Sequence, residues 1–404
     1  MNTSLLHTPD GVRDIYGREL AEKKCVGESL MKVMRSYGYR NIQTPTFEFF
    51  DVFSKDIGTI PSKDLYKFFD KEGNTLVLRP DFTPAIARCA AKYFMEEEYP
   101  LRFCYEGNSF VNTSELQGKL KETTQMGIEL INDGSVYADA EVLMLVVDGL
   151  KACGLTEFQV SVGDTSYFKG ICEEAHLDEE TQQMIREYIS SKNYFGTQEF
   201  LRKQNIASDV IRDFEAISKI YCSDEELLSM KEHATNARSL AAIERMLTLK
   251  NVLAMHGYDK YITVDFGMLS KINYYTGIIF KAYTYGVGDA IVKGGRYDGL
   301  LGQFGKEAPS VGCAFYLDEI HTSLKRQQIQ ILPTEMQFCI VLYDDVSYKV
   351  AFEAAASERM AATCVSMVKK DSDKALEEYF DYAKTMNASK VLVAENRQLK
   401  EYNL

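Results

Sequence analysis

The stretch from residue 289 to residue 300 reads DAIVKGGRYDGL. Its first part is a short apolar strand pattern, and the paired glycines Gly294 and Gly295 permit a backbone geometry and a close approach that other residues do not. As a phosphate loop the motif is weak, because no helix N-terminus with a Walker lysine follows it. On these residues alone, a plain turn after a strand is the better interpretation.

Strand patterns precede this stretch at 261–267 and 273–286, and a polar linker, 323–336, follows it. Pro333 marks a boundary, because proline interrupts regular structure. Beyond it, apolar strands and helical patterns alternate as β-α-β-α-β. This order predicts a small parallel sheet of three strands.

The chain before residue 261 divides into two regions. From about 165 to 250 glycine nearly vanishes and apolar residues recur at helical spacing, which predicts a separate all-helical insert. The earlier region is mixed. Its expected elements are a helix around 26–37, a hairpin turn at Gly73-Asn74, a helix from Pro84, strands at 101–110 and 123–132, and a mostly buried helix at 138–153.

Length and composition limit the class of protein. The 404 residues suit two or three domains, and 46% hydrophobic with 26% charged residues is the balance of a soluble globular protein without a membrane span. Nine dispersed cysteines and no signal-peptide pattern predict reduced thiols in the cytoplasm. A net charge of −13, with basic residues adjacent only in pairs, disfavours nucleic acid as a partner.

Two strand patterns carry polar residues suited to a ligand. Asp81 and Thr83, two apart at a strand end, would point to one face and bind an ammonium group, although spacing alone favours a turn with a cap. Gln125, Gly127 and Glu129 share one face of another strand, and the missing side chain of Gly127 would leave room for a ligand. A solvated alternating strand is an equally good interpretation of this second pattern.

Tyr274 and Tyr275 form a third candidate. In a strand, adjacent side chains point to opposite faces, so at most one of them would line a pocket. Two ordinary core or surface tyrosines are the alternative. The five histidines are isolated from one another and from the cysteines, so the sequence predicts neither a metal site nor a cofactor. It offers a polar pocket without an evident catalytic group.

In their order along the chain, these motifs resemble the histidyl-tRNA synthetases. The matching segments are LRPDFT followed by Arg88, RFCYEGNSF…GKLKETTQMGIE in motif 2, NYYTGIIF in the histidine-specific segment, and VKGGRYDGL…PSVGCAF leading into motif 3. The similarity implies the α+β fold of class II aminoacyl-tRNA synthetases, an antiparallel sheet flanked by helices. Residues 1–322 would form this domain, with the helical insert at about 165–250, and 337–404 would form a small C-terminal α/β domain resembling a shortened anticodon-binding domain.

Three arginines of the synthetases are replaced. The motif 2 arginine falls on Val111, the arginine of the histidine-specific R-G-L-D-Y-Y segment on Ser270, and the arginine that closes motif 3 on Glu319. Adenylation builds negative charge on phosphate, and losing one fixed donor that stabilises such charge commonly costs roughly 3–4 kcal/mol. The resemblance therefore implies a chain without synthetase catalytic residues.

The other side of the synthetase pocket is retained. The positions that surround histidine in the family correspond here to Asp81, Thr83, Gln125, Glu129, Tyr274 and Tyr275, with Asp81 shortening the family glutamate. An amino-acid pocket without the nucleotide machinery resembles the regulatory subunits of ATP phosphoribosyltransferase. That family implies a hetero-oligomer with a short-form catalytic subunit, self-association as a dimer, histidine as the feedback effector of histidine biosynthesis, and no role for tRNA or a membrane.

Two other functions stay open at this point. One is a synthetase-like module that binds tRNA or senses histidine, and the other is a working histidyl-tRNA synthetase whose motif 2 loop is misaligned here. Histidine itself would bind either in the retained pocket or at the contact with the catalytic subunit.

Overall fold

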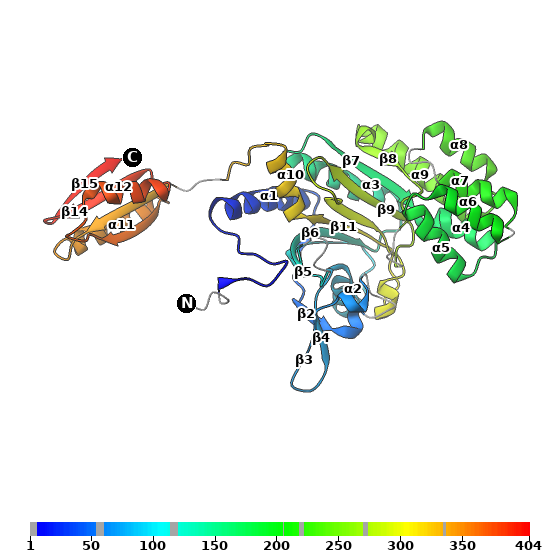
Figure 1. The fold of residues 1–404 in the computed structure, drawn as a ribbon, viewed down its shortest axis with the longest axis horizontal. Coiled ribbons are helices and arrows are strands. Elements are labelled where there is room, and N and C mark those ends of the chain that lie inside the picture. Colours follow the sequence, from blue (N-terminus) through cyan, green and yellow to red (C-terminus); the bar gives the residue numbers. More distant parts are fainter. Residues whose placement is uncertain are drawn as a thin grey trace. The chain divides into compact units, whose positions relative to one another are not determined.

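The computed structural model describes residues 6–53, 60–113, 120–204, 206–217, 222–269, 274–333 and 337–404. The chain divides into two compact units, with the boundary between Ile331 and Leu332 (Figure 1). None of the described helices is both long and apolar enough to cross a membrane.

The larger unit is built on an eight-stranded sheet in the order β1-β5-β6-β11-β10-β9-β7-β8. Its neighbouring strands are antiparallel, except for the pairs β1–β5 and β7–β8. The strands are β1 (Arg40–Asn41), β5 (Leu101–Phe110), β6 (Glu122–Ile131), β7 (Phe158–Asp164), β8 (Ile262–Val264), β9 (Ile278–Thr284), β10 (Val292–Arg296) and β11 (Ser310–Tyr316).

Helices α1 (Gly17–Ser36), α3 (Val136–Ala152) and α10 (Leu317–Arg326) cover one face of this sheet. Strand alternation turns Met126 and Ile128 of β6 toward them, into a core that includes Leu30 and Leu143. As predicted, most of α3 is buried. The polar linker predicted from residue 323 begins later, because α10 continues to Arg326.

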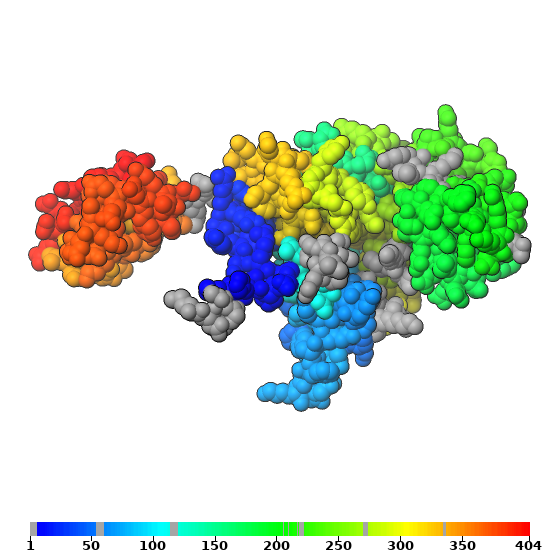
Figure 2. Space-filling view, viewed as in Figure 1, coloured from blue at the N-terminus to red at the C-terminus, as the bar shows by residue number. Residues whose placement is uncertain are grey.

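The other face carries α2 (Thr83–Tyr93) and a second, three-stranded sheet in the order β2-β4-β3. Its strands are β2 (Phe47–Phe49), β3 (Lys67–Phe69) and β4 (Thr75–Leu78). The predicted hairpin is confirmed: β3 and β4 pair antiparallel, and Gly73 adopts φ 86° in the turn between them. This hairpin projects from the larger unit (Figure 2).

Residues 165–255 are mainly helical. The helices are α4 (Thr165–Glu174), α5 (Glu179–Ser190), α6 (Tyr194–Lys203), α7 (Ser208–Ile217), α8 (Asp224–His233) and α9 (Ala237–Met255). Helix α9 packs on α3 and α4, and its buried residues belong to the same apolar core as the central sheet. Short 3-10 helices complete the unit at Phe50–Phe53, Ser62–Asp64, Asp259–Tyr261 and Leu301–Phe304.

The smaller unit is an α/β sandwich with the sheet order β13-β12-β14-β15 and one helix on each face. Its elements are β12 (Phe338–Tyr343), α11 (Tyr348–Met360), β13 (Cys364–Lys369), α12 (Leu376–Thr385), β14 (Lys390–Glu395) and β15 (Gln398–Asn403). Together with the antiparallel sheet and helices of the larger unit, it confirms the predicted fold class.

The predicted parallel three-stranded sheet omitted one strand. β12 pairs parallel with β13 and β14, but β15 adds an antiparallel edge. The turn before β15 consists of Asn396 and Arg397, both with positive φ (51° and 62°). Such two-residue hairpins usually contain Asn-Gly, and the largely exposed β15 lacks an apolar alternation, so neither usual signal was present.

Candidate functional site

A cavity of about 130 Å³ lies on the face of the central sheet that carries α2. The turn before α2, the loop before β9 and strands β6, β10 and β11 surround it. Its charged, amide and hydroxyl lining residues are Asp81, Thr83, Gln125, Tyr274, Tyr275, Lys293, Tyr297 and Tyr316. For comparison, a cavity of about 150 Å³ holds one benzene molecule, so this one suits a ligand with a single small ring.

Glycines form the floor of the cavity. Gly294 and Gly295 lie inside β10, where Gly295 pairs with Gly312 of β11, so the interpretation of the glycine pair as a plain turn is wrong. A Cβ at Gly295 would lie 2.7 Å from the Tyr275 ring, and one at Gly312 would collide with the Glu129 carboxylate. The glycines are therefore required for these two side chains to lie against the strands.

Glu129 is buried in β6 beside the cavity, and hydroxyl groups donate to both of its carboxylate oxygens. Thr83 Oγ1 donates to Oε1 at 2.7 Å, and the Tyr297 hydroxyl donates to Oε2. Burial raises the pKa of Glu129 to about 8 against these two donors, and the nearby Asp81 charge adds to the rise. A ligand cation at this end of the cavity would relieve the repulsion between the two acidic groups.

The predicted common strand face for Asp81 and Thr83 is wrong. β4 ends at Leu78, Asp81 lies in the following turn, and Thr83 is the first residue of α2. Asp81 Oδ1 accepts hydrogen bonds from the backbone amides of Phe82, at 2.6 Å, and Thr83, at 3.4 Å. The alternative of a turn with local hydrogen bonding is therefore the correct description, and both side chains still line the cavity.

The predicted space for a ligand at Gly127 is also wrong, because Tyr105 fills it. A Cβ at Gly127 would collide with the Tyr105 hydroxyl and with the Cys313 carbonyl. The Tyr105 hydroxyl and Gln125 Oε1 are buried, and neither has a hydrogen-bond partner in the part of the chain that the structure describes. Because a buried polar atom without a partner costs roughly 1–3 kcal/mol, a polar ligand that reaches them would gain affinity.

Both Tyr274 and Tyr275 line the cavity, so the prediction that at most one could do so is wrong. The reason is that β9 begins only at Ile278, and strand alternation does not apply to the loop before it. The two rings lie with their centroids 4.8 Å apart, tilted by 56°.

Side chains of helix α4 hold this loop by donating hydrogen bonds to the backbone carbonyl groups of the loop. Thr165 Oγ1 donates to the carbonyl of Gly277 at 3.1 Å, and Ser166 Oγ donates to that of Thr276 at 2.8 Å. Lys169 Nζ donates to the carbonyl of Tyr275 at 3.0 Å. The helical region thus positions the tyrosine wall of the cavity.

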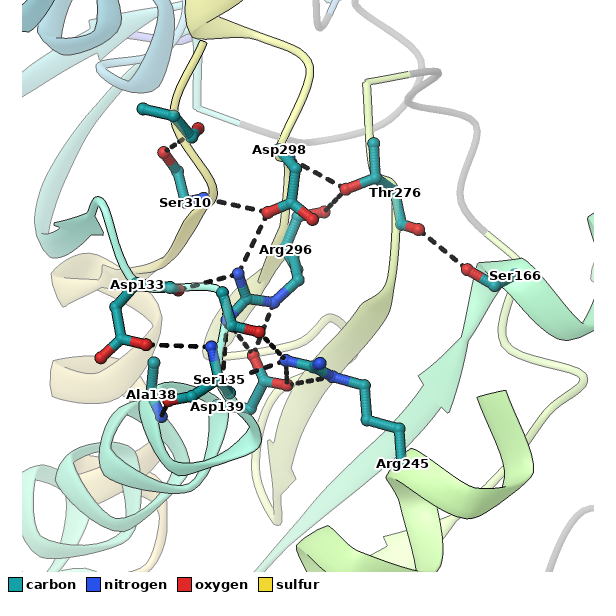
Figure 3. Close-up of polar contacts among 12 residues, drawn as sticks. Asp133, Ser135, Ala138, Asp139, Ser166, Arg245, Thr276, Arg296, Asp298 and Ser310 are labelled. Atoms are coloured by element: carbon teal, nitrogen blue, oxygen red, sulfur yellow. Dashed lines mark hydrogen bonds and ion pairs between the residues drawn. The ribbon is translucent and has the colours of Figure 1, made fainter. Parts of the chain in front are cut away.

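Arg296 belongs to a buried ionic network (Figure 3). Its guanidinium donates to the Asp139 carboxylate of α3 at 2.7 Å and pairs with Asp298 at 3.0 Å. Arg245 of α9 donates to the same Asp139 at 2.7 Å, and the Asp298 carboxylate accepts from the backbone amide of Ser310 at 3.0 Å. The network joins β10 to two helices and to β11. Arg296 and Asp298, the charged residues that follow the paired glycines, therefore support the fold.

The sequence interpretation missed Tyr105, Lys293, Tyr297 and Tyr316 as parts of the site. Lys293, Gly295 and Tyr297 alternate along the strand and its immediate continuation, and this alternation was the available signal. Tyr105 and Tyr316 gave no such signal, because only the register of β5, β6 and β11 brings them beside Gly127 and Gln125.

Two of the three replaced arginine positions lie within the described residues. Val111 follows β5, where its amide donates to the Lys121 carbonyl at 2.9 Å, and Glu319 lies in the first turn of α10. Neither lines the cavity. Ser270 lies outside the described residues.

Known proteins resemble the chain over most of its length. The sequence profile of the histidyl-tRNA synthetase family matches residues 11–320. Among curated relatives, the ATP phosphoribosyltransferase regulatory subunit of Acetivibrio thermocellus is 37% identical over 90% of this chain and 86% of its own. The corresponding subunit of Clostridium novyi is 32% identical over 98% of this chain and 94% of its own.

Solved structures show the same relationship. A protein of Bacillus halodurans described as an ATP phosphoribosyltransferase regulatory subunit/histidyl-tRNA synthetase superposes with a TM-score of 0.84 at 27% identity, covering 96% of this chain and 98% of its own. The histidyl-tRNA synthetase of a Nostoc species shares the fold, with a TM-score of 0.78 at 19% identity over 98% and 96%. This chain therefore belongs to the family of ATP phosphoribosyltransferase regulatory subunits, which is built on the histidyl-tRNA synthetase fold.

Proposed function

We propose that this chain is a non-catalytic subunit that supports a short-form ATP phosphoribosyltransferase catalytic subunit and conveys feedback inhibition by histidine. In this proposal histidine binds in the cavity on the glycine floor. The observation that carries the proposal is the pair of acidic groups at the cavity: Asp81 lines it, and the buried Glu129 lies beside it with its pKa raised by burial and by the Asp81 charge.

The chemistry of histidine suits this arrangement. Its amino group and imidazole ring supply donors to the Asp81 and Glu129 carboxylates and to Gln125 Oε1. The volume of about 130 Å³ favours one small ring over a nucleotide. Val111 and Glu319 supply no cation for a phosphate, which argues against amino-acid activation.

The test is a reconstitution. The purified chain is mixed with its cognate short-form catalytic subunit, and phosphoribosyl-ATP formation is followed with and without histidine. We expect activity to rise on mixing and histidine to suppress it. Absence of both a complex and an effect would favour a tRNA-binding or histidine-sensing module instead, and histidine-dependent pyrophosphate exchange by the chain alone would establish a synthetase.

Glu129→Ala is expected to weaken histidine binding without preventing assembly with the catalytic subunit. Removing one partner of a buried, hydrogen-bonded charge pair costs roughly 2–5 kcal/mol, so the affinity should fall by roughly a hundredfold. Titration calorimetry on the chain alone measures this directly. Glu122→Ala is the control, because Glu122 lies on the opposite face of the same strand, away from the cavity. Unchanged inhibition of the Glu129→Ala complex would move the effector site to the subunit interface.

We further propose that the chain self-associates through the three-stranded sheet. Phe47, Phe49 and Phe68 share one face of this sheet and are 52%, 56% and 37% exposed, which makes them an apolar patch suited to a second copy. Phe49→Asp is expected to weaken the dimer at least about thirtyfold, as loss of a central aromatic contact does. Analytical ultracentrifugation measures the change.

The opposite face of the same sheet provides the control. Phe69 is 72% exposed but points away from the patch, so Phe69→Asp should leave the dimer intact. Equal effects of the two substitutions, or none from Phe49→Asp, would place the contact elsewhere.

A further inference from the structure

Among the residues that the structure describes, Lys293 is the one cationic side chain that lines the cavity. It lies in β10 two residues before Gly295, so both residues face the same side of the sheet. In the strand register it pairs with Ala314, another cavity residue, and with Lys281 of β9. A positive group thus sits on the face that carries the glycine floor.

Within the described part of the chain, the Lys293 ammonium contacts an aromatic ring and a solvent-exposed carboxylate. Its Nζ lies 4.8 Å from the centre of the Tyr316 ring, which also lines the cavity, and 3.3 Å from Asp289 Oδ1. The side chains of Lys293 and Asp289 are 34% and 44% exposed, so this ion pair is of the weak surface type. The ammonium is therefore available to a ligand anion without breaking a strong buried pair.

Like charges repel each other at two places beside the cavity. Burial lowers the pKa of Lys281, and the facing Lys293 ammonium lowers it further, so the two lysines repel each other. Beside Asp81, burial raises the pKa of Glu129 and the Asp81 charge raises it further, so repulsion disfavours ionising both acids together. A ligand with a cationic and an anionic group would relieve both repulsions, whereas a simple amine or a simple acid would relieve only one.

From this arrangement we propose that Lys293 binds the carboxylate of an α-amino acid whose nitrogen groups face Asp81 and Glu129. The inference rests on the proposed histidine site and names the group that completes it. Lys293 supplies the positive charge that Val111 and Glu319 do not, and it makes the site selective for the free amino acid over its derivatives that lack a carboxylate.

The experiment compares histidine with histidinol, which keeps the amino group and imidazole but carries a hydroxymethyl group in place of the carboxylate. Affinities are measured by calorimetry on the full-length chain and on Lys293→Met, Lys293→Arg and Asp289→Asn. We expect the wild type to prefer histidine by roughly tenfold to a hundredfold, the range for a hydrogen bond to a charged group. Lys293→Met should lose this preference while its histidinol affinity stays unchanged, and Lys293→Arg should restore most of it.

Asp289→Asn is the matched control, because it removes the partner and leaves the ammonium in place, so the preference should persist. A Lys293→Met variant that keeps the wild-type preference, or that loses affinity for both ligands equally, would overturn the role of Lys293 while leaving the histidine site standing. A folded wild type that binds neither ligand would instead overturn the histidine site, and the carboxylate contact with it.

Discussion

Glu129→Gln is expected to stabilise the free protein above neutral pH and to leave its stability near pH 5 almost unchanged. The pKa of the buried Glu129 carboxyl is about 8, against an ordinary value of 4.5, so the folded protein keeps a proton that the unfolded chain has released. The contribution of Glu129 to the free energy of unfolding therefore falls as pH rises from about 4.5 to about 8, and it is constant at higher pH. Gln cannot ionise, so the variant avoids this loss, which is on the order of 4 kcal/mol.

Urea unfolding of wild type and variant without histidine, at several values between about pH 5 and pH 9, measures the difference. Asp164 is also buried with a pKa raised to about 6, but it contributes equally to both proteins and cancels in the comparison. Glu122→Gln on the opposite face of β6 is the control and should keep the wild-type profile. Parallel curves for wild type and Glu129→Gln would mean that Glu129 is already ionised in the folded protein.

Asp139→Asn is expected to destabilise the larger unit by roughly 3–5 kcal/mol, the usual cost of removing one partner from a buried ion pair. Asp139 is fully buried and accepts from both Arg296 and Arg245, and Arg296 is 3% exposed. Without the carboxylate, the partners that remain for the buried Arg296 guanidinium in the described part of the chain are Asp298 and the carbonyl groups of Asp133 and Ser135. Chemical denaturation followed by circular dichroism gives the change in unfolding free energy.

The exposed pair of Arg238 and Glu173 offers a comparison within the same helical region. Glu173→Gln should cost less than about 1 kcal/mol, because water compensates the loss of a surface ion pair. If Asp139→Asn were as mild as this control, the network around Arg296 would not be what fixes β10 against α3 and α9.

Local patterns predicted much of the secondary structure. The hairpin at Gly73, the helix from Pro84 and the buried helix α3 follow from turn chemistry and apolar spacing, which act between near neighbours. One kind of mistake occurred at the boundary of an element. Treating Tyr274 and Tyr275 as strand residues implied opposite faces, but β9 begins at Ile278 and both rings reach the cavity.

The order of motifs in the sequence determined the family and the fold class, and it predicted five residues that line one cavity: Asp81, Thr83, Gln125, Tyr274 and Tyr275. What each of them does there was decided by the tertiary structure. Gly127 makes room for Tyr105 because β5 lies beside β6, and the pKa of Glu129 is raised because packing removes its carboxyl group from water. Lys293 joins the site because the register places β10 next to β11. Burial and register depend on segments far apart in the chain, so no local pattern contains them.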